Sequence, residues 1–126
     1  MDVKPFFLTY FRVTYDEKTF SFEDFCEQLG LDLQETKDYG ATDNIYIGYH
    51  YATTEDLNEM VRTSLKDLFG KEEILAKLKE KYNLKYTLER VPTVSNNYRL
   101  NLSLANDIIA FLYKTGSSDN LDYFVD

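Results

Sequence analysis

Few residues in this chain can do acid–base or nucleophilic chemistry. There is one histidine, His50, and one cysteine, Cys26. A histidine base needs a nucleophile or an orienting acid at hydrogen-bond distance, and no familiar motif surrounds His50. Cys26 falls at helical spacing with Phe22, Phe25 and Leu29, so we interpret it as a small hydrophobic residue of the core. One histidine and one cysteine cannot form a Cys/His zinc site within one chain.

Carboxylates are the other candidates for chemistry. Asp32, Glu35, Asp38 and Asp43 lie within twelve residues of each other. The surrounding sequence lacks the alternating ligands, central glycine and final glutamate of an EF-hand. A pair of carboxylates for glycoside hydrolysis stays formally open, but acids this frequent pair by chance. The chain has no phosphate-binding glycine loop and no nucleophile elbow. We therefore expect no catalytic residues, no metal, no cofactor and no enzymatic activity.

Tyrosines form the most suggestive group. Residues 45–51 alternate as a strand, which predicts Ile45, Ile47, Tyr49 and Tyr51 on one face and Tyr46, Gly48 and His50 on the other. Tyrosines on the face without helices would form a binding patch, because tyrosine offers a rigid apolar ring and one polar atom. The candidate binding surface combines these residues with the preceding acids: Asp38, Asp43, Tyr46, Tyr49, His50 and Tyr51.

The elements that would position this surface follow from apolar spacing and from helix-capping residues. Residues 6–14, FFLTYFRVT, are apolar on both faces and predict a central strand. The remaining predicted elements are a helix from Ser21 to Gly30, a short strand at 31–36, the strand at 45–51, a helical pair from Thr53 or Thr54 to Asn83, a strand at 84–91 before a Pro92 loop, a strand at 98–102, a helix after Ser103 and a strand at 121–125. This order predicts a single α+β domain over residues 1–126. It is a two-layer sandwich whose mainly antiparallel sheet carries helices on one face, with ferredoxin-like elements and additions.

Composition and charge narrow the partner. Twenty of the 126 residues are Phe or Tyr, and the net charge is −8. Residues 1–60 contain 13 acidic and 4 basic side chains, whereas residues 61–126 contain 9 acidic and 10 basic ones. Such an acidic chain is a poor match for nucleic acid and a better match for a basic protein. The lone cysteine, the absence of a signal-peptide pattern and the lack of a long apolar run predict a cytoplasmic protein that binds no membrane.

An ordered set of segments resembles a known bacterial family. These segments are the aromatic first strand, FEDFCEQLGLDLQET, the DYG turn, DLNEMVRTSLKDLFGKEEILAKLKEKYNL, LSLANDIIAFLYKTG and the final strand with Asp122 and Tyr123. Together they resemble the bacterial family called domain of unknown function 4279 over nearly the whole chain. Members of that family usually carry a Trp in the strand after the glycine turn, where this chain has Tyr46 or its neighbours. The resemblance implies a bacterial α+β domain and transfers no activity.

These observations predict a protein-binding domain, for example an immunity protein that neutralises a toxin. Small size, acidity, many tyrosines and the lack of a catalytic set all favour this function. The alternative is a sensor or regulatory domain that binds a small molecule, which would need a closed apolar pocket near the sheet. A homodimer stays open.

Overall fold

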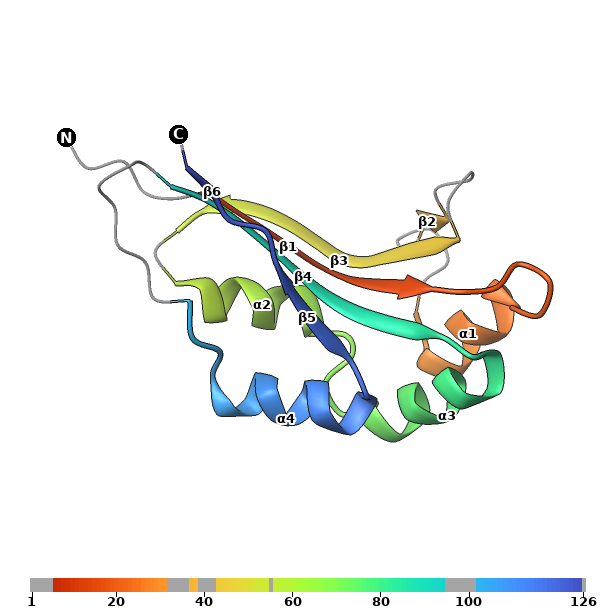
Figure 1. Ribbon diagram of the computed structural model, residues 1–126. Coiled ribbons are helices and arrows are strands. Elements are labelled where there is room, and N and C mark those ends of the chain that lie inside the picture. The colour runs from red at the N-terminus through yellow and green to blue at the C-terminus, as the bar shows by residue number, and fades with distance from the viewer. Residues whose placement is uncertain (1–5, 32–36, 39–42, 55, 95–101, 126) are drawn as a thin grey trace.

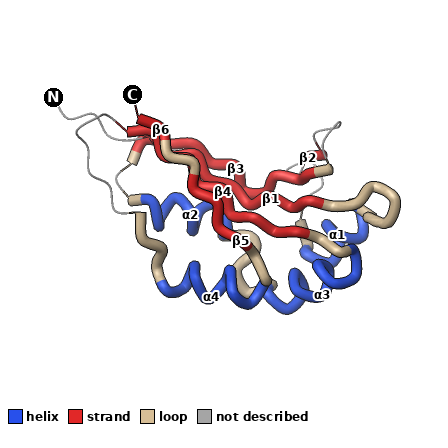
Figure 2. Tube along the Cα trace, in the orientation of Figure 1, coloured by secondary structure: helices blue, strands red, loops and turns tan. Residues whose placement is uncertain are grey.

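The fold is built from one sheet with helices on one side. The computed structural model describes residues 6–31, 37–38, 43–54, 56–94 and 102–125. In Figure 1 the strands form the upper layer and the four helices lie together beneath it. Figure 2 shows the same two layers, with strands in red and helices in blue. The predicted two-layer α+β architecture is confirmed.

The helices and strands follow each other along the chain in the expected alternation. They are β1 (Phe6–Thr14), α1 (Phe22–Leu29), β2 (Lys37–Asp38), β3 (Asn44–Thr53), α2 (Leu57–Leu65), α3 (Glu72–Tyr82), β4 (Lys85–Val94), α4 (Asn106–Thr115), β5 (Ser118–Leu121) and β6 (Phe124–Val125).

The sheet has the strand order β2-β3-β1-β4-β5, and β6 also pairs with β4. β1 is central and pairs antiparallel with both β3 and β4, while β2 pairs antiparallel with β3. The first four strands with their connecting helices therefore form the ferredoxin-like arrangement. The additions are α4, β5 and β6, and the last two strands run parallel to β4.

One face of the sheet and the helices enclose the core. Alternate residues of β1 point into it, and Phe7, Phe11 and Val13 are fully buried there. Tyr86 of β4 is also fully buried, and its hydroxyl donates a hydrogen bond to the Leu75 carbonyl at 2.6 Å. Burying these large side chains against the helices supplies most of the stability of such a layer.

The ends of the helices mostly follow the predicted capping residues. Ser21 accepts a hydrogen bond from the Asp24 amide, and Gly30 ends α1 in the left-handed conformation that glycine favours. Asn83 ends α3 in the same conformation. The prediction that Thr53 or Thr54 caps α2 is wrong, because Asp56 is the N-cap and accepts from the Glu59 amide at 3.1 Å.

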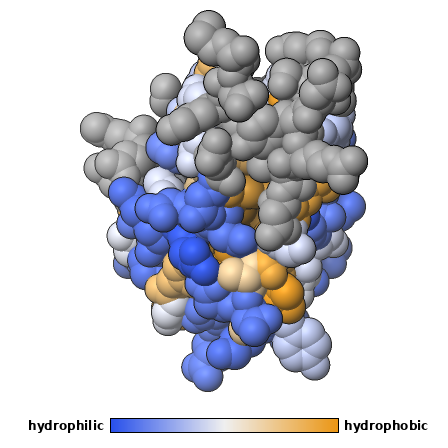
Figure 3. Space-filling model, turned by 90° about the vertical axis from the view of Figure 1, so that its left-hand side faces the viewer, coloured by the Kyte–Doolittle hydropathy of each residue, from blue (hydrophilic) through white to orange (hydrophobic). Residues whose placement is uncertain are grey.

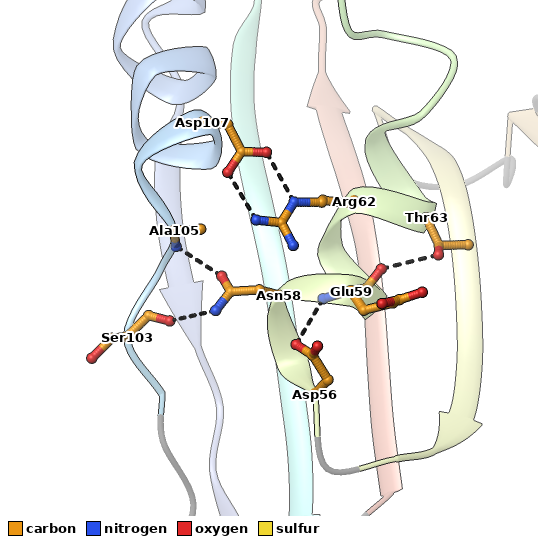
Figure 4. Close-up of polar contacts among 8 residues, drawn as sticks. All are labelled: Asp56, Asn58, Glu59, Arg62, Thr63, Ser103, Ala105 and Asp107. Atoms are coloured by element: carbon orange, nitrogen blue, oxygen red, sulfur yellow. Dashed lines mark hydrogen bonds and ion pairs between the residues drawn. The ribbon is translucent and has the colours of Figure 1, made fainter.

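The first residue of α4 is capped from another helix. Ser103 was expected to cap it, but the N-cap is Ala105, which has no side chain able to do so. Instead, the Asn58 side chain of α2 accepts from the Ala105 amide at 2.8 Å and donates to the Ser103 carbonyl at 3.1 Å (Figure 4). An ion pair between Arg62 and Asp107 joins the same two helices.

A buried arginine holds β5 and the segment before α4 against β4. Arg90 is 5% exposed, and its Nε and Nη2 donate to the Asp119 carboxylate at 2.8 and 2.6 Å. Its Nη1 donates to the Leu102 carbonyl at 2.8 Å. A forked guanidinium suits such two-sided bonding.

The fourth strand is longer than predicted. β4 continues through Pro92, which pairs with Phe7 of β1, so the predicted loop at Pro92 is wrong. Pro92 falls between the residues that pair with β5 and those that pair with β6, where its missing N–H costs no hydrogen bond. The strand predicted at 121–125 is split between the end of β5 and β6.

Two other predicted strands cannot be compared. The strand at 31–36 and most of the strand at 98–102 lie outside the described residues. No helix in the described part of the chain is long and apolar enough to cross a bilayer.

Candidate functional site

A bulge in β3 decides which side chains reach the helix-free face of the sheet. Thr9 of β1 pairs with His50 and Phe11 pairs with Ile47, so two residues of β3, Gly48 and Tyr49, lie opposite Tyr10 alone. Gly48 has φ of 68°, the left-handed conformation typical of the glycine in such a bulge. The extra residue shifts the inward–outward alternation of the strand by one.

The shift places three tyrosines on the same face. Before the bulge, Ile45 and Ile47 are buried toward the helices, and Tyr46 faces the other way. After the bulge, Tyr49 and Tyr51 are 63% and 62% exposed. The prediction that Tyr46 lies on the opposite face from Tyr49 and Tyr51 is therefore wrong.

Helix α2 packs directly on the bulge. A Cβ atom at Gly48 would lie 1.8 Å from the carbonyl oxygen of Ser64, which leaves no room for any other residue. Ser64 and Thr9 are both buried, and their hydroxyls share a hydrogen bond. Ser64 also donates to the Thr9 carbonyl at 3.0 Å, and Thr9 donates to the Met60 carbonyl at 3.2 Å. The bulge is thus held in place by the helical layer.

Side chains from β1 complete an aromatic surface on the helix-free face. Tyr10 contacts Tyr46 edge-on and stacks on Tyr49, with ring centroids 5.2 and 5.5 Å apart. Phe6 stacks on Tyr51 at 5.3 Å. We call this surface the aromatic face, and its residues are Phe6, Leu8, Tyr10, Tyr46, Tyr49 and Tyr51.

A shallow hollow lies between β1 and β3 on this face. Its volume is about 250 Å³, and the described residues that line it are Leu8, Tyr10, Tyr46 and Tyr49. Tyr46 and Tyr49 are three positions apart along the chain and still share a face, because the bulge lies between them. We call it the tyrosine hollow.

A buried ion pair borders the aromatic face. Glu89 of β4 pairs across strands with Tyr10 and is 3% exposed. One of its oxygens lies 2.9 Å from Nη2 of Arg12, and the other accepts from Asn120 at 2.7 Å. Burial, and then the negative charge of Glu89, raise the pKa of Tyr10.

The ion pair is incompletely hydrogen-bonded among the described residues. Glu89 Oε1 lies near Arg12 but outside hydrogen-bond geometry, and Arg12 Nε and the Thr87 hydroxyl are buried without a partner there. Burying charge in this way costs stability unless every polar atom is satisfied. Such a costly arrangement beside an exposed aromatic surface favours a functional role for that surface.

The other predicted surface residues lie around this face or away from it. Asp43 is exposed just before β3, and its carbonyl accepts from the Tyr15 amide at 2.8 Å. Asp38 pairs with Ile45 in the short strand β2. His50 pairs with buried Thr9, so the bulge turns it toward the helices and separates it from the tyrosines.

Sequence reasoning missed half of the aromatic face. It grouped the tyrosines of β3 but left out Phe6, Leu8, Arg12 and Glu89, since β1 was apolar on both faces. The signal that could have found the arrangement is Gly48, because a glycine inside a strand pattern often marks a bulge.

The structure gives little support to chemistry elsewhere. Cys26 is 1% exposed, and burial raises the pKa of its thiol to about 11, so the unreactive protonated form dominates at neutral pH. Within the described ranges, no group of three or more His, Cys, Asp or Glu side chains could hold a metal ion.

The helical layer presents a less continuous apolar surface. Figure 3 views the end of the molecule at which α2 and α4 begin, and its apolar areas are interrupted by hydrophilic residues below the grey ones. The large exposed apolar side chains of α3 and α4 are Ile74, Ile109 and Tyr113. The aromatic face is therefore the stronger candidate for a binding site.

Comparisons of the chain with protein-family models, with curated proteins and with solved structures returned no match. The resemblance to the domain of unknown function 4279 family therefore stays a prediction.

Proposed function

We propose that this protein is a non-enzymatic binding domain that holds another protein on its aromatic face. The observation that carries the proposal is the Gly48 bulge, which gathers three tyrosines of β3 beside Phe6, Leu8 and Tyr10 on the side without helices. Rigid aromatic rings are the usual energetic anchors of protein interfaces.

The partner we propose is basic. The chain has a net charge of −8, and most of the excess acid is in residues 1–60, which include β1, β3 and the connection between them. A second copy of this chain would be repelled by the same charge, whereas a basic partner would be steered toward it. Charge complementarity thus favours a different, basic protein over a homodimer.

In its sharper form, the proposal is that the domain is a bacterial immunity protein that works in the cytoplasm and neutralises a toxin. Blocking a basic toxin needs no catalytic group, only an acidic surface with strong anchors. The aromatic face, with Tyr49 and Tyr51 more than 60% exposed, offers such anchors.

The alternative of a small-molecule sensor has less support. A sensor site is usually an enclosed apolar pocket with a few converging polar groups. The tyrosine hollow is shallow, and a hollow of about 670 Å³ on the helical side is lined by Gly70, Ala76 and the charged or exposed residues Glu72, Glu73, Ile74 and Lys114.

A toxin-protection experiment tests the proposal. A candidate toxin encoded next to this protein would be expressed with the wild type, with the double variant Tyr49→Ser/Tyr51→Ser, and with Tyr113→Ser as the matched control on α4. Tyr113 is 87% exposed and lies in the helical layer. We expect protection and a purified complex with the wild type and the control, and loss of both with the double variant.

Two outcomes would count against the proposal in different ways. Protection that survives the double variant would exclude the aromatic face as the binding site. If wild-type protein neither protected cells nor formed a complex with the neighbouring product, the immunity function should be abandoned.

A further inference from the structure

The tyrosine hollow has the features of a site for an organic cation. We propose that it binds the guanidinium group of an arginine side chain supplied by the basic partner. The identity of the arginine's carrier rests on the proposed function, whereas the preference of the hollow for a guanidinium does not.

The rings provide faces in two orientations. Tyr46 stands at 83° to Tyr10, while Tyr49 lies within 23° of parallel to it. The hollow they line with Leu8 has a volume of about 250 Å³, enough for the end of one long side chain. A cation that lies within about 6 Å of a ring centroid is attracted by the negative face of the ring.

The nearest buried charge also favours a cation. Glu89 is the cross-strand partner of Tyr10 on the same face and is almost fully buried. The positive charge of Arg12, which pairs with Tyr46, is opposed by Glu89 at 2.9 Å. Because Glu89 affects Tyr10 more strongly than Arg12 does, the field at this ring is negative.

Other occupants fit these features less well. An anion would meet the ring faces and Glu89, and the one nearby cation, Arg12, is already paired. A neutral aliphatic side chain would leave the negative field unused. Arginine fits better than lysine, because a planar guanidinium stacks on an aromatic ring and keeps its N–H donors available for phenolic oxygens.

A titration with small probes tests the proposal without the partner. The probe is N-acetyl-arginine amide, and the comparisons are N-acetyl-lysine amide and N-acetyl-citrulline amide, whose side chain has nearly the same shape as arginine but no charge. Binding is followed by NMR through the ring signals of Tyr10, Tyr46 and Tyr49. We expect saturable shifts with arginine, about threefold weaker binding of lysine and at least fivefold weaker binding of citrulline.

Ring variants locate the bound cation. Tyr49→Leu removes one aromatic face at an exposed position and should weaken arginine binding about threefold, whereas Tyr49→Phe keeps the face and should bind within twofold of wild type. Tyr113→Leu on α4 is the matched control and should bind as wild type does.

Equal binding of citrulline, or shifts that leave these rings unchanged, would overturn the proposal. Lysine binding as tight as arginine binding would overturn the assignment to a guanidinium. The two proposals fail separately. A hollow without arginine preference, in a protein whose protection still needs Tyr49 and Tyr51, would leave the binding function standing. Arginine binding without any protection would leave the cation site and remove the immunity function.

Discussion

At the scale of single residues, Gly48 fixes the geometry of the aromatic face. It combines a left-handed backbone with the closest approach of α2 to the sheet. Alanine at this position would be strained by its φ and would also collide with the Ser64 carbonyl.

We therefore expect Gly48→Ala to lower the free energy of unfolding by more than about 3 kcal/mol, or to prevent folding. Gly30→Ala is the matched control, since Gly30 has nearly the same φ but no atom within 4 Å of an added Cβ. It should cost about 1–2 kcal/mol. Urea denaturation measures both, and equal losses would contradict the role given to the close approach.

The buried thiol gives a second prediction at this scale. Because burial raises the pKa of Cys26 to about 11, we expect a thiol reagent at pH 8 to label folded protein only as fast as the chain opens. Labelling followed by absorbance should be slow in buffer and fast in concentrated urea. Rapid labelling of folded protein would mean that Cys26 is accessible.

At the scale of elements, two ion pairs with similar geometry differ in their surroundings. Arg90 is buried and bonds Asp119 with two nitrogens, whereas both partners of the Arg62–Asp107 pair are largely exposed. Asp119→Ala would leave a buried charge and detach β5 from β4.

We expect Asp119→Ala to lower the free energy of unfolding by about 3 kcal/mol. Asp107→Ala should cost far less, because water replaces the lost partner of an exposed arginine. Thermal unfolding of the two variants under the same conditions provides the comparison. A loss for Asp107→Ala as large as that for Asp119→Ala would show that exposure does not decide the outcome.

How far the sequence predicted each element depended on how local its cause was. β1 and the ends of α1 follow from nearby residues, and their bounds were predicted well. Pro92 continues a strand because of where β5 and β6 pair, and Asn58 caps α4 from another helix. Neither cause is visible in the local pattern. The bulge is intermediate, since Gly48 marked its place but strict alternation around it predicted the wrong face for Tyr46.

At the scale of the whole molecule, net charge should act on the rate of binding. An acidic chain is steered toward a basic partner over a distance that salt shortens. We expect the association rate constant with the partner to fall about tenfold between 20 and 200 mM salt, while the dissociation rate constant changes little. Stopped-flow mixing or surface binding measures both. An association rate that does not depend on salt would contradict a basic partner.

The same experiment separates charge from anchoring. Tyr49→Ser should mainly raise the dissociation rate constant and leave the salt dependence intact, because the exposed ring acts after contact is made. An unchanged dissociation rate would place the anchor elsewhere.

The central position of β1 has a consequence for synthesis of the protein on the ribosome. β1 is made first, yet it is flanked by β3 and β4, and β4 ends 80 residues after β1 does. At typical translation rates this takes about 4–16 s. During that time the apolar segment FFLTYFRVT lacks a neighbour on at least one edge. The nascent chain therefore exposes its most aggregation-prone strand longest, and slowing translation beyond residue 53 should lower the yield of folded protein unless chaperones are abundant.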